Sequence, residues 1–333
     1  MTAYAIELQS LRRTFDVRGG AQRLALDRVD LSLPTSGVHG LLGPNGAGKT
    51  TICKIIATVL LPTSGRARVL GHDVVRETAT VRSLLGIVFG GERGLYERLT
   101  AMENLQFWCA MHGMRAGPGR RRAQDLLERL GLGSRAQHRV ETFSRGMKQR
   151  LHLARGLVSD PPVLLLDEPT VGMDPVSARD FRTVIADLRA EGRTVLLTTH
   201  DMDEAQALCD SVTFIDNGRL LGTGSPAHVR GMLGNSRRIM IDDVDAAAAG
   251  DLTGVLDRLP AHVRARLQIR HDPADHTLSI EVPTETHVIA AVMSAVLAAG
   301  HTAVSAAPPS LGEVYLTLLG TDAQGARRGM EVG

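Results

Sequence analysis

Short runs of aliphatic and β-branched residues alternate, over the first two thirds of the chain, with segments whose apolar residues recur at helical spacing. Four runs predict buried strands: residues 38–42, 163–166, 194–199 and 211–215. Three segments predict helices: residues 101–113, 121–132 and 147–158. The Gly/Pro-rich segment 115–120 is the predicted link between the first two helices. This alternation is typical of an α/β domain with a largely parallel sheet, and we place a helical subdomain within it at about residues 97–160.

The pattern changes after about residue 234, which predicts a second domain. Before that point, the sequence Asp216-Asn217-Gly218 predicts a tight hairpin turn that closes the first domain. Beyond it, strands and helices are predicted in the order β-α-β-β-α-β, with a short helix at the end: 238–241, 246–259, 267–270, 277–282, 287–299, 302–305 and 311–319. We therefore predict an α/β domain at 1–233, a small two-layer α+β accessory domain at 234–320 and a disordered tail at 321–333.

Composition narrows the possible functions. The chain has 333 residues, 43% of them hydrophobic, and its 38 basic and 36 acidic residues give a net charge of +2. A nearly neutral chain does not favour tight binding to a phosphate backbone, so we expect no nucleic-acid partner. Three separated cysteines predict no disulfide framework and fit a reducing cytoplasm. The longest nearly apolar stretch, residues 288–299, is much shorter than the roughly 20 residues of a membrane helix, so a membrane role requires a partner.

One glycine-rich segment has the spacing of a phosphate-binding loop. The pattern G-x-x-x-x-G-K-[ST] is met by the run Gly43, Pro44, Asn45, Gly46, Ala47, Gly48, Lys49, Thr50 and Thr51. The run lies between a predicted strand and a predicted helix, where backbone N–H groups and the helix N-terminus can surround phosphates. In this role Lys49 contacts the terminal phosphates of ATP and Thr50 ligates Mg²⁺. The alternative is a glycine-rich turn with a chance lysine, although only three residues of the chain are lysines.

An apolar strand that ends in two acids supplies the second half of such a site, with the sequence VLLLDEP at 163–169. Asp167 is placed to hold Mg²⁺, and Glu168 to orient and deprotonate the attacking water. His200, at the end of the predicted strand 194–199, can donate a hydrogen bond to the γ-phosphate. The alternatives are solvated acids at a strand end and a structural histidine. The other eleven histidines lack ligand spacing, so we expect no metal site built by protein side chains alone.

At these motifs the sequence resembles the ATP-binding subunits of ATP-binding cassette (ABC) transporters, over about residues 4–230. Residues 143–147 occupy the place of the family's LSGGQ signature; Ser144 and Gly146 match it, whereas Arg145 and Met147 do not. The resemblance implies a P-loop cassette with Mg²⁺-dependent ATPase activity. It also implies a head-to-tail homodimer, in which the signature of one copy caps the ATP that the P-loop of the other holds. The alternative for this segment is a serine-capped amphipathic helix.

Other motifs of the family follow in order, with one departure. The resemblance implies that Asp174 belongs to the D-loop and that Phe15 stacks on adenine, although a core phenylalanine is the alternative for Phe15. The family usually carries a glutamine that touches Mg²⁺ where this chain has Gly90 and Gly91. Glu92 is the candidate substitute, and its charge would alter the site.

The single cassette with a C-terminal extension resembles the subunits of bacterial ABC-2-type exporters, including the daunorubicin-resistance group. The resemblance implies a separate transmembrane permease and a cytoplasmic cassette held peripherally at the inner face of the membrane. Two alternatives remain: a cassette ATPase acting on nucleic acid or ribosomes, and a non-hydrolytic switch that dimerises on ATP. Relatives with the first function usually carry two cassettes or a long coiled-coil insertion, and neither is visible in this sequence. We interpret Arg115 and Arg120–Arg122 as a solvated face or as a surface that meets lipid headgroups. Glu168 and His200 argue against the second.

Overall fold

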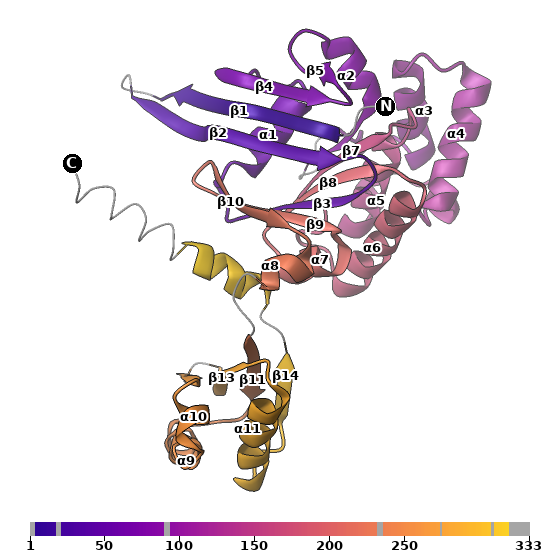
Figure 1. Cartoon of the computed structure of the whole chain (residues 1–333). Helices are drawn as coiled ribbons and strands as arrows, with labels where there is room; N and C mark the ends of the chain where they lie inside the picture. Colours follow the sequence, from indigo (N-terminus) through magenta and orange to yellow (C-terminus); the bar gives the residue numbers. More distant parts are fainter. Residues whose placement is uncertain are drawn as a thin grey trace. The chain divides into compact units, whose positions relative to one another are not determined.

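The computed structural model describes residues 4–17, 21–89, 94–231, 236–273, 275–307 and 310–319. The chain separates into two compact units, Met1–Pro226 and Ala227–Gly333 (Figure 1). The predicted boundary lies later, between residues 233 and 234, so the short helix α8 (Pro226–Gly231) falls almost entirely in the second unit. The predicted tail at 321–333 and the positions of Gly90, Gly91 and Glu92 lie outside the described residues.

Six strands form the central sheet of the first unit, in the order β10-β9-β3-β8-β7-β6. They are β3 (Gly37–Leu42), β6 (Leu85–Val88), β7 (Val163–Asp167), β8 (Thr194–Thr199), β9 (Ser211–Asp216) and β10 (Arg219–Gly224). Five of the six run parallel, and β10, which follows the predicted turn, is antiparallel to β9. Every residue of β3, β7 and β8 is buried, which explains why their sequences are mainly apolar runs rather than alternating ones. The four predicted strands and the largely parallel sheet are confirmed.

A second, antiparallel sheet has the order β2-β1-β4-β5. Its strands are β1 (Tyr4–Asp16), β2 (Gln22–Pro34), β4 (Ser64–Val69) and β5 (His72–Asp73). The hydrophobic pattern did not predict β1 and β2 because bulges interrupt their alternation: Ser10 and Arg28 have φ of 45° and 50°, and the register of β1 shifts beside Ser10. One core joins Leu8 of this sheet, Ile52 of the helix α1 (Lys49–Ile56) and Leu165 of the central sheet. The helix α2 (Thr78–Leu84) leads into β6.

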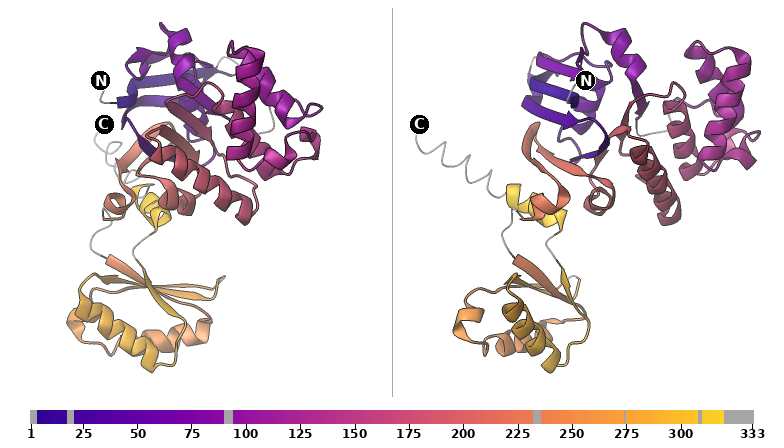
Figure 2. Two further views of the ribbon diagram at one scale, coloured as in Figure 1. Left: turned by 90° about the vertical axis from the view of Figure 1, so that its right-hand side faces the viewer. Right: turned by 45° about the vertical axis from the view of Figure 1, so that its right-hand side comes forward.

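Three helices form the helical subdomain: α3 (Ala101–Met111), α4 (Ala116–Arg129) and α5 (Arg145–Gly156), with single 3₁₀ turns η1 (Gly133–Arg135) and η2 (Val140–Thr142) between the last two. In both views of Figure 2, α3 and α4 (magenta) form a lobe beside the sheets. Thr100 and Glu103 cap the start of α3 reciprocally. The predicted link at 115–120 is wrong, because α4 already begins at Ala116. Pro118 lies in the first turn, where its missing N–H forfeits no helical hydrogen bond.

The helices α6 (Pro175–Ala190) and α7 (Met202–Leu208) complete the first unit. Asp174 caps α6, since its carboxylate accepts a hydrogen bond from the N–H of Ser177 at 2.9 Å. Phe181 and Ile185 form the buried face of α6.

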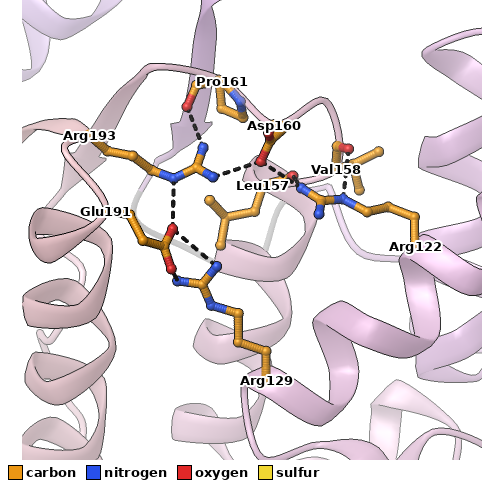
Figure 3. Close-up of polar contacts among 8 residues, drawn as sticks. All are labelled: Arg122, Arg129, Leu157, Val158, Asp160, Pro161, Glu191 and Arg193. Carbon is orange, nitrogen blue, oxygen red and sulfur yellow. Dashed lines mark hydrogen bonds and ion pairs between the residues drawn. The ribbon is translucent and has the colours of Figure 1, made fainter.

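A polar network ties the helical subdomain to the turn before β7 and to the start of β8 (Figure 3). Arg122 of α4 donates to the carbonyl oxygen of Leu157 at 2.7 Å and to the carboxylate of Asp160 at 3.0 Å. Arg193, just before β8, donates to the same carboxylate oxygen at 2.6 Å and to the carbonyl oxygen of Pro161 at 2.7 Å. Arg122 is therefore not part of a solvated face, because it holds the end of α5 to α4.

The second unit has a sheet of order β12-β13-β11-β14, with every pairing antiparallel. Its elements are β11 (Ser236–Ile241), α9 (Ala246–Leu256), α10 (Ala261–Arg264), β12 (Gln268–Asp272), β13 (Thr277–Pro283), α11 (Thr286–Ala298) and β14 (Val304–Ala307), followed by a helix at 311–319. Leu252 of α9 and Val292 of α11 share one core with Ile239 and Ile280 of the sheet. This is the β-α-β-β-α-β topology of ferredoxin-like folds, and it confirms the predicted two-layer α+β fold. Within the described residues, no helix is long and apolar enough to cross a membrane.

The Asp160 network generates a prediction about stability. Arg193→Ala should lower the free energy of unfolding by about 1.5–3 kcal/mol, because it removes charge-assisted hydrogen bonds and leaves the carbonyl oxygen of Pro161 without its donor. Urea denaturation measures this change. The matched control is Arg129→Ala, since Arg129 pairs with Glu191 at a more exposed position and should cost only about 0–1 kcal/mol. Equal losses for the two variants would contradict a special role for Arg193.

Candidate functional site

The turn from β3 into α1 builds the phosphate-binding loop. Gly48 is the N-cap residue of α1 and has φ of 115°. Because glycine has no side chain to accept hydrogen bonds, the first N–H groups of the helix remain available in the loop. Two glycines are required sterically. A Cβ at Gly43 would lie 2.1 Å from the carbonyl oxygen of Ile215, and one at Gly48 would lie 2.8 Å from a methyl carbon of Leu26. The loop can therefore approach a ligand only through backbone atoms, as phosphate binding requires.

Lys49 is a buried cation that faces this loop. Its side chain is 4% exposed, and Nζ donates to the carbonyl oxygens of Gly43 and Pro44 at 2.7 and 3.2 Å. Nζ also lies 3.2 Å from Oε1 of Glu168 at the end of β7. The lysine side chain thus already folds back over the loop where the terminal phosphates of a nucleotide would lie.

Hard oxygen donors gather beside Lys49. The hydroxyl of Thr50 donates to Oδ2 of Asp167 at 2.9 Å, and the hydroxyl of Thr198 donates to Oδ1 of the same carboxylate at 2.5 Å. Within the described part of the chain, no group of three His, Cys, Asp or Glu side chains could hold a metal ion. One carboxylate with one hydroxyl fits Mg²⁺, which typically takes few protein oxygens and completes its shell with water and phosphate. When bound, Mg²⁺ neutralises charge on the phosphates.

Glu168 occupies the corner between Lys49 and His200. Its backbone has φ of 50°, a left-handed conformation that is rare for a glutamate. Its N–H donates to the carbonyl oxygen of Thr198 at 3.0 Å, which holds the residue in this conformation. Oε1 lies 3.5 Å from Nδ1 of His200, and the two side chains are 26% and 47% exposed. A carboxylate that is positioned in this way and reached by solvent can orient a water molecule next to the phosphate loop.

A cavity of about 290 Å³ extends from the phosphate loop, and Phe15 lines it together with Lys49 and Thr50. The ring of Phe15 is partly buried, and the guanidinium carbon of Arg13 lies 4.5 Å from its centroid. Phe15 is therefore a cavity wall rather than a core residue. Arg23 also lines the cavity, and sequence reasoning missed it because an insertion near Gly19 and Gly20 loosens the alignment of this segment.

The signature residues do not join this constellation. Ser144 caps α5 by accepting from the N–H of Met147 at 3.3 Å, and Gly146 is packed so closely on α6 that a Cβ would lie 2.6 Å from the hydroxyl of Ser177. Neither of them, nor Asp174, lines the nucleotide cavity of its own chain. The guanidinium of Arg145 lies against Gly172 instead, and this side chain reaches a neighbouring cavity.

Comparison with known proteins decides the family. A family model described as ABC transporter matches residues 26–171. The chain is 38% identical to the daunorubicin resistance ATP-binding protein DrrA3 of Streptomyces coeruleorubidus over 300 residues. This alignment covers 90% of this chain and 92% of that protein. It is 43% identical over 201 residues to the ABC transporter ATP-binding protein NatA of Bacillus subtilis, covering 60% of this chain and 82% of the relative. The chain belongs to the ATP-binding proteins of ABC transporters.

Solved structures agree with this family assignment. The ATP-binding cassette MJ0796, in a dimeric post-hydrolysis state bound to ADP and Pi, matches with a TM-score of 0.61 and 26% identity, over 66% of this chain and 98% of that one. The predicted ABC cassette fold, ATPase activity and kinship with the daunorubicin-resistance group are confirmed. This ABC ATPase is therefore an ATP-binding and ATP-hydrolysing protein of the ABC transporter family. Cassettes of the family generally dimerise and act with transmembrane permeases.

One buried acid of the ABC ATPase escaped sequence reasoning. Glu204 is 3% exposed, and Oε1 accepts from the hydroxyl of Thr170 at 2.6 Å, whereas Oε2 has no hydrogen-bond partner in the part of the chain that the structure describes. Burial raises the pKa of this carboxyl. Glu204 lines one small cavity together with His200 and Gly172. The sequence did show that Glu204 follows His200 by four residues, at the start of α7. It could not show that Glu204 is buried, because burial depends on tertiary packing.

The raised pKa of Glu204 predicts a pH-dependent stability. The folded protein holds the proton more tightly than the unfolded chain, so stability falls as pH rises from the unfolded pKa near 4.5 through the raised folded value. Glu204→Gln should remove this slope, with a gain over wild type of about 1.4 kcal/mol for each unit that the pKa is raised. Denaturation from pH 4.5 to 8.5 measures it. Glu77 is the opposite case, because its hydrogen bond with His72 lowers its pKa and its stabilising effect is lost only as pH falls below 4.5. Glu77→Gln should therefore show little pH-dependent difference from wild type between pH 4.5 and 8.5. A pH-independent difference for Glu204→Gln would contradict the assignment.

Proposed function

We propose that this ABC ATPase hydrolyses Mg²⁺-ATP in a head-to-tail homodimer and drives a separate ABC-2-type permease. The observation that carries the proposal is the Lys49–Glu168–His200 cluster, at 3.2 and 3.5 Å, directly beside the Thr50–Asp167 pair. The cluster combines a buried cation for the phosphates, oxygens for Mg²⁺ and a solvent-accessible base for water.

The contact between Lys49 and Glu168 suggests how ATP prepares the site. Lys49 now shares its charge between loop carbonyls and Glu168. The terminal phosphates of ATP are stronger partners for the ammonium and take the place of the carboxylate, so Glu168 becomes free to accept a water proton. The oxygen of that water attacks the γ-phosphorus, the bond to the β,γ-bridging oxygen breaks, and ADP and phosphate form. His200 steadies the carboxylate and donates toward the γ-phosphate.

The second copy supplies what one chain lacks. Ser144, Arg145, Gly146 and Met147 begin α5, and Asp174 begins α6, yet Ser144, Gly146, Met147 and Asp174 do not line the nucleotide cavity of their own chain. In the proposed dimer they face the ATP that the partner copy holds. The dimeric cassette MJ0796 supports this arrangement. Phe15, at the far end of the cavity, is proposed to stack on adenine.

Exposed apolar side chains on the helical subdomain support a membrane partner. Tyr96, Phe107 and Met111 are 47%, 37% and 65% exposed, and the first two rings meet edge to face at 4.9 Å. Such a patch favours a protein interface over a solvated surface. We therefore propose a cytoplasmic cassette held at the inner face of the membrane through its permease. The names of relatives, which include linearmycin resistance ATP-binding protein LnrL of Bacillus subtilis, support a drug-like cargo.

The first test of the function concerns Lys49. Lys49→Ala should reduce ATP hydrolysis at least 100-fold, because it removes the buried cation that folds over the phosphate loop, whereas Arg23, the other cation that lines the cavity, is exposed. Hydrolysis is followed at several protein concentrations, and a rise steeper than linear is expected for a dimer. Lys54→Ala is the matched control: it removes the same charge from an exposed position on the same helix and should leave the rate unchanged. Full activity in Lys49→Ala would refute the site.

Glu168→Gln separates hydrolysis from dimer formation. The amide cannot accept the water proton, so turnover should fall by about 10²–10⁴-fold while ATP still binds. Size-exclusion chromatography with ATP should then show a dimer that wild type forms only transiently. The exposed Glu128→Gln serves as control and should behave as wild type. Wild-type turnover in Glu168→Gln would show that another group is the base, which would contradict the proposed mechanism. The same result would also exclude a switch that does not hydrolyse ATP.

A further inference from the structure

A second cavity, of about 640 Å³, adjoins the catalytic site on the side of the helical subdomain. The core contributes Thr50, Asp167 and Glu168 to its lining. The helix α5 contributes Arg145, Lys148, Gln149 and His152. The residues proposed to bind Mg²⁺ and to activate the attacking water therefore line the same cavity as the middle of α5.

His152 is unusual among the buried groups of the chain. Its side chain is 1% exposed, and neither ring nitrogen has a hydrogen-bond partner among the described residues. Nε2 of Gln149, on the same face of α5, is likewise buried and without a partner. Buried polar atoms in folded proteins are nearly always satisfied, because an unmade hydrogen bond costs free energy. These atoms, on a helix that faces the catalytic residues, indicate a partner that arrives with the substrate.

His39 provides the contrast within the same chain. It is 3% exposed, yet one ring nitrogen lies 2.7 Å from the hydroxyl of Ser211 and the other 3.2 Å from the carbonyl oxygen of Pro34. A buried structural histidine in this protein is thus paired at both nitrogens, whereas His152 is paired at neither. A purely packing role for position 152 would be served better by leucine, which carries no polar atoms to desolvate.

The surroundings of His152 decide its chemical form. Burial, with the nearby charges of Arg155 and Lys148, lowers the pKa of His152 to about 4. A neutral imidazole has one N–H donor and one lone pair, which suits the water molecules around a hard cation. Direct ligation is not indicated, since no described group of three ligating side chains could hold a metal.

We propose that His152 is a positioning residue that hydrogen-bonds, through the 640 Å³ cavity, to the water shell of the Mg²⁺ bound with ATP at Thr50 and Asp167. It makes α5, the helix that begins with the signature residues, responsive to the metal-loaded nucleotide in the same chain. The inference rests on the proposed Mg²⁺-ATP site. Gln149, whose Nε2 is also buried without a partner among the described residues, lines the same cavity.

The test measures how Mg²⁺ alters thermal stability in the presence of a slowly hydrolysed ATP analogue, so the readout does not depend on turnover. His152→Leu should raise the Mg²⁺ concentration that gives half of the maximal stabilisation by about 3- to 10-fold, because the variant loses one hydrogen bond to the water shell of the metal. Stabilisation by the analogue with EDTA should not change. His152→Gln retains a donor and an acceptor and should restore most of the wild-type response. His39→Gln is the control, expected to lower stability without shifting the Mg²⁺ dependence.

A second measurement uses the unaltered protein, in case His152→Leu does not fold. The ring ¹⁵N resonances of His152, assigned by their absence in His152→Gln, should shift when Mg²⁺ is added to the analogue-bound protein. A wild-type Mg²⁺ response in His152→Leu, or ring resonances that ignore Mg²⁺, would overturn the inference while leaving the catalytic site intact. If wild type itself shows no Mg²⁺-dependent stabilisation, the metal site at Thr50 and Asp167 is wrong, and the inference fails with it.

Discussion

The catalytic half of this molecule depends on the absence of two side chains. A Cβ at Gly43 would meet the backbone of β9, and a Cβ at Gly48 would meet the antiparallel sheet. Because both positions are glycine, β3 can turn directly into α1, and a single core packs this helix against both sheets. The same turn leaves the first amides of α1 without a cap and folds Lys49 back over the loop. Phosphate binding and the packing of the two sheets are therefore consequences of one backbone geometry.

Electrostatics then couples the loop to the neighbouring strands. Lys49 is nearly inaccessible to solvent, so it needs compensation in every state of the protein. Loop carbonyls and Glu168 provide that compensation here, and the phosphates of ATP replace Glu168 in the proposed cycle. Asp167 is held from both sides by the hydroxyls of Thr50 and Thr198, which leaves the strand ends of β7 and β8 in a fixed relation to α1. In the proposed cycle, Lys49 therefore responds to ATP by exchanging Glu168 for the phosphates, while Asp167 stays in place.

The helical subdomain is attached by a different kind of interaction. Arginines of α4 and of the segment before β8 converge on Asp160 in the turn that follows α5, so the far end of α5 is anchored by charge. The near end carries the signature residues, and the face between them carries His152 and Gln149 toward the catalytic cavity. The helix thus has an end secured by charge, a middle where His152 and Nε2 of Gln149 lack partners among the described residues, and an end directed at a second copy of the chain in the proposed dimer.

Four features could be predicted from the sequence alone: the phosphate loop, the acids that end β7, the parallel strands and the two-layer C-terminal fold. These features depend on residue types at short spacing or on continuous apolar runs, which the chain displays directly. The bulged strands β1 and β2 were missed because positive φ at Ser10 and Arg28 disrupts their alternation. The start of α4 was misplaced because Pro118 in a first turn looks like a breaker.

Only the tertiary structure decided which polar groups are satisfied. Ser144 and Gly146 do not line the nucleotide cavity of their own chain, and Arg122 anchors the end of α5. Among the described residues, His152 has no hydrogen-bond partner, whereas His39 is paired at both nitrogens. Helical periodicity assigns such residues to a face, but their partners come from segments distant along the chain. Burial and hydrogen-bond pairing are properties of that assembly, so no local pattern could specify them.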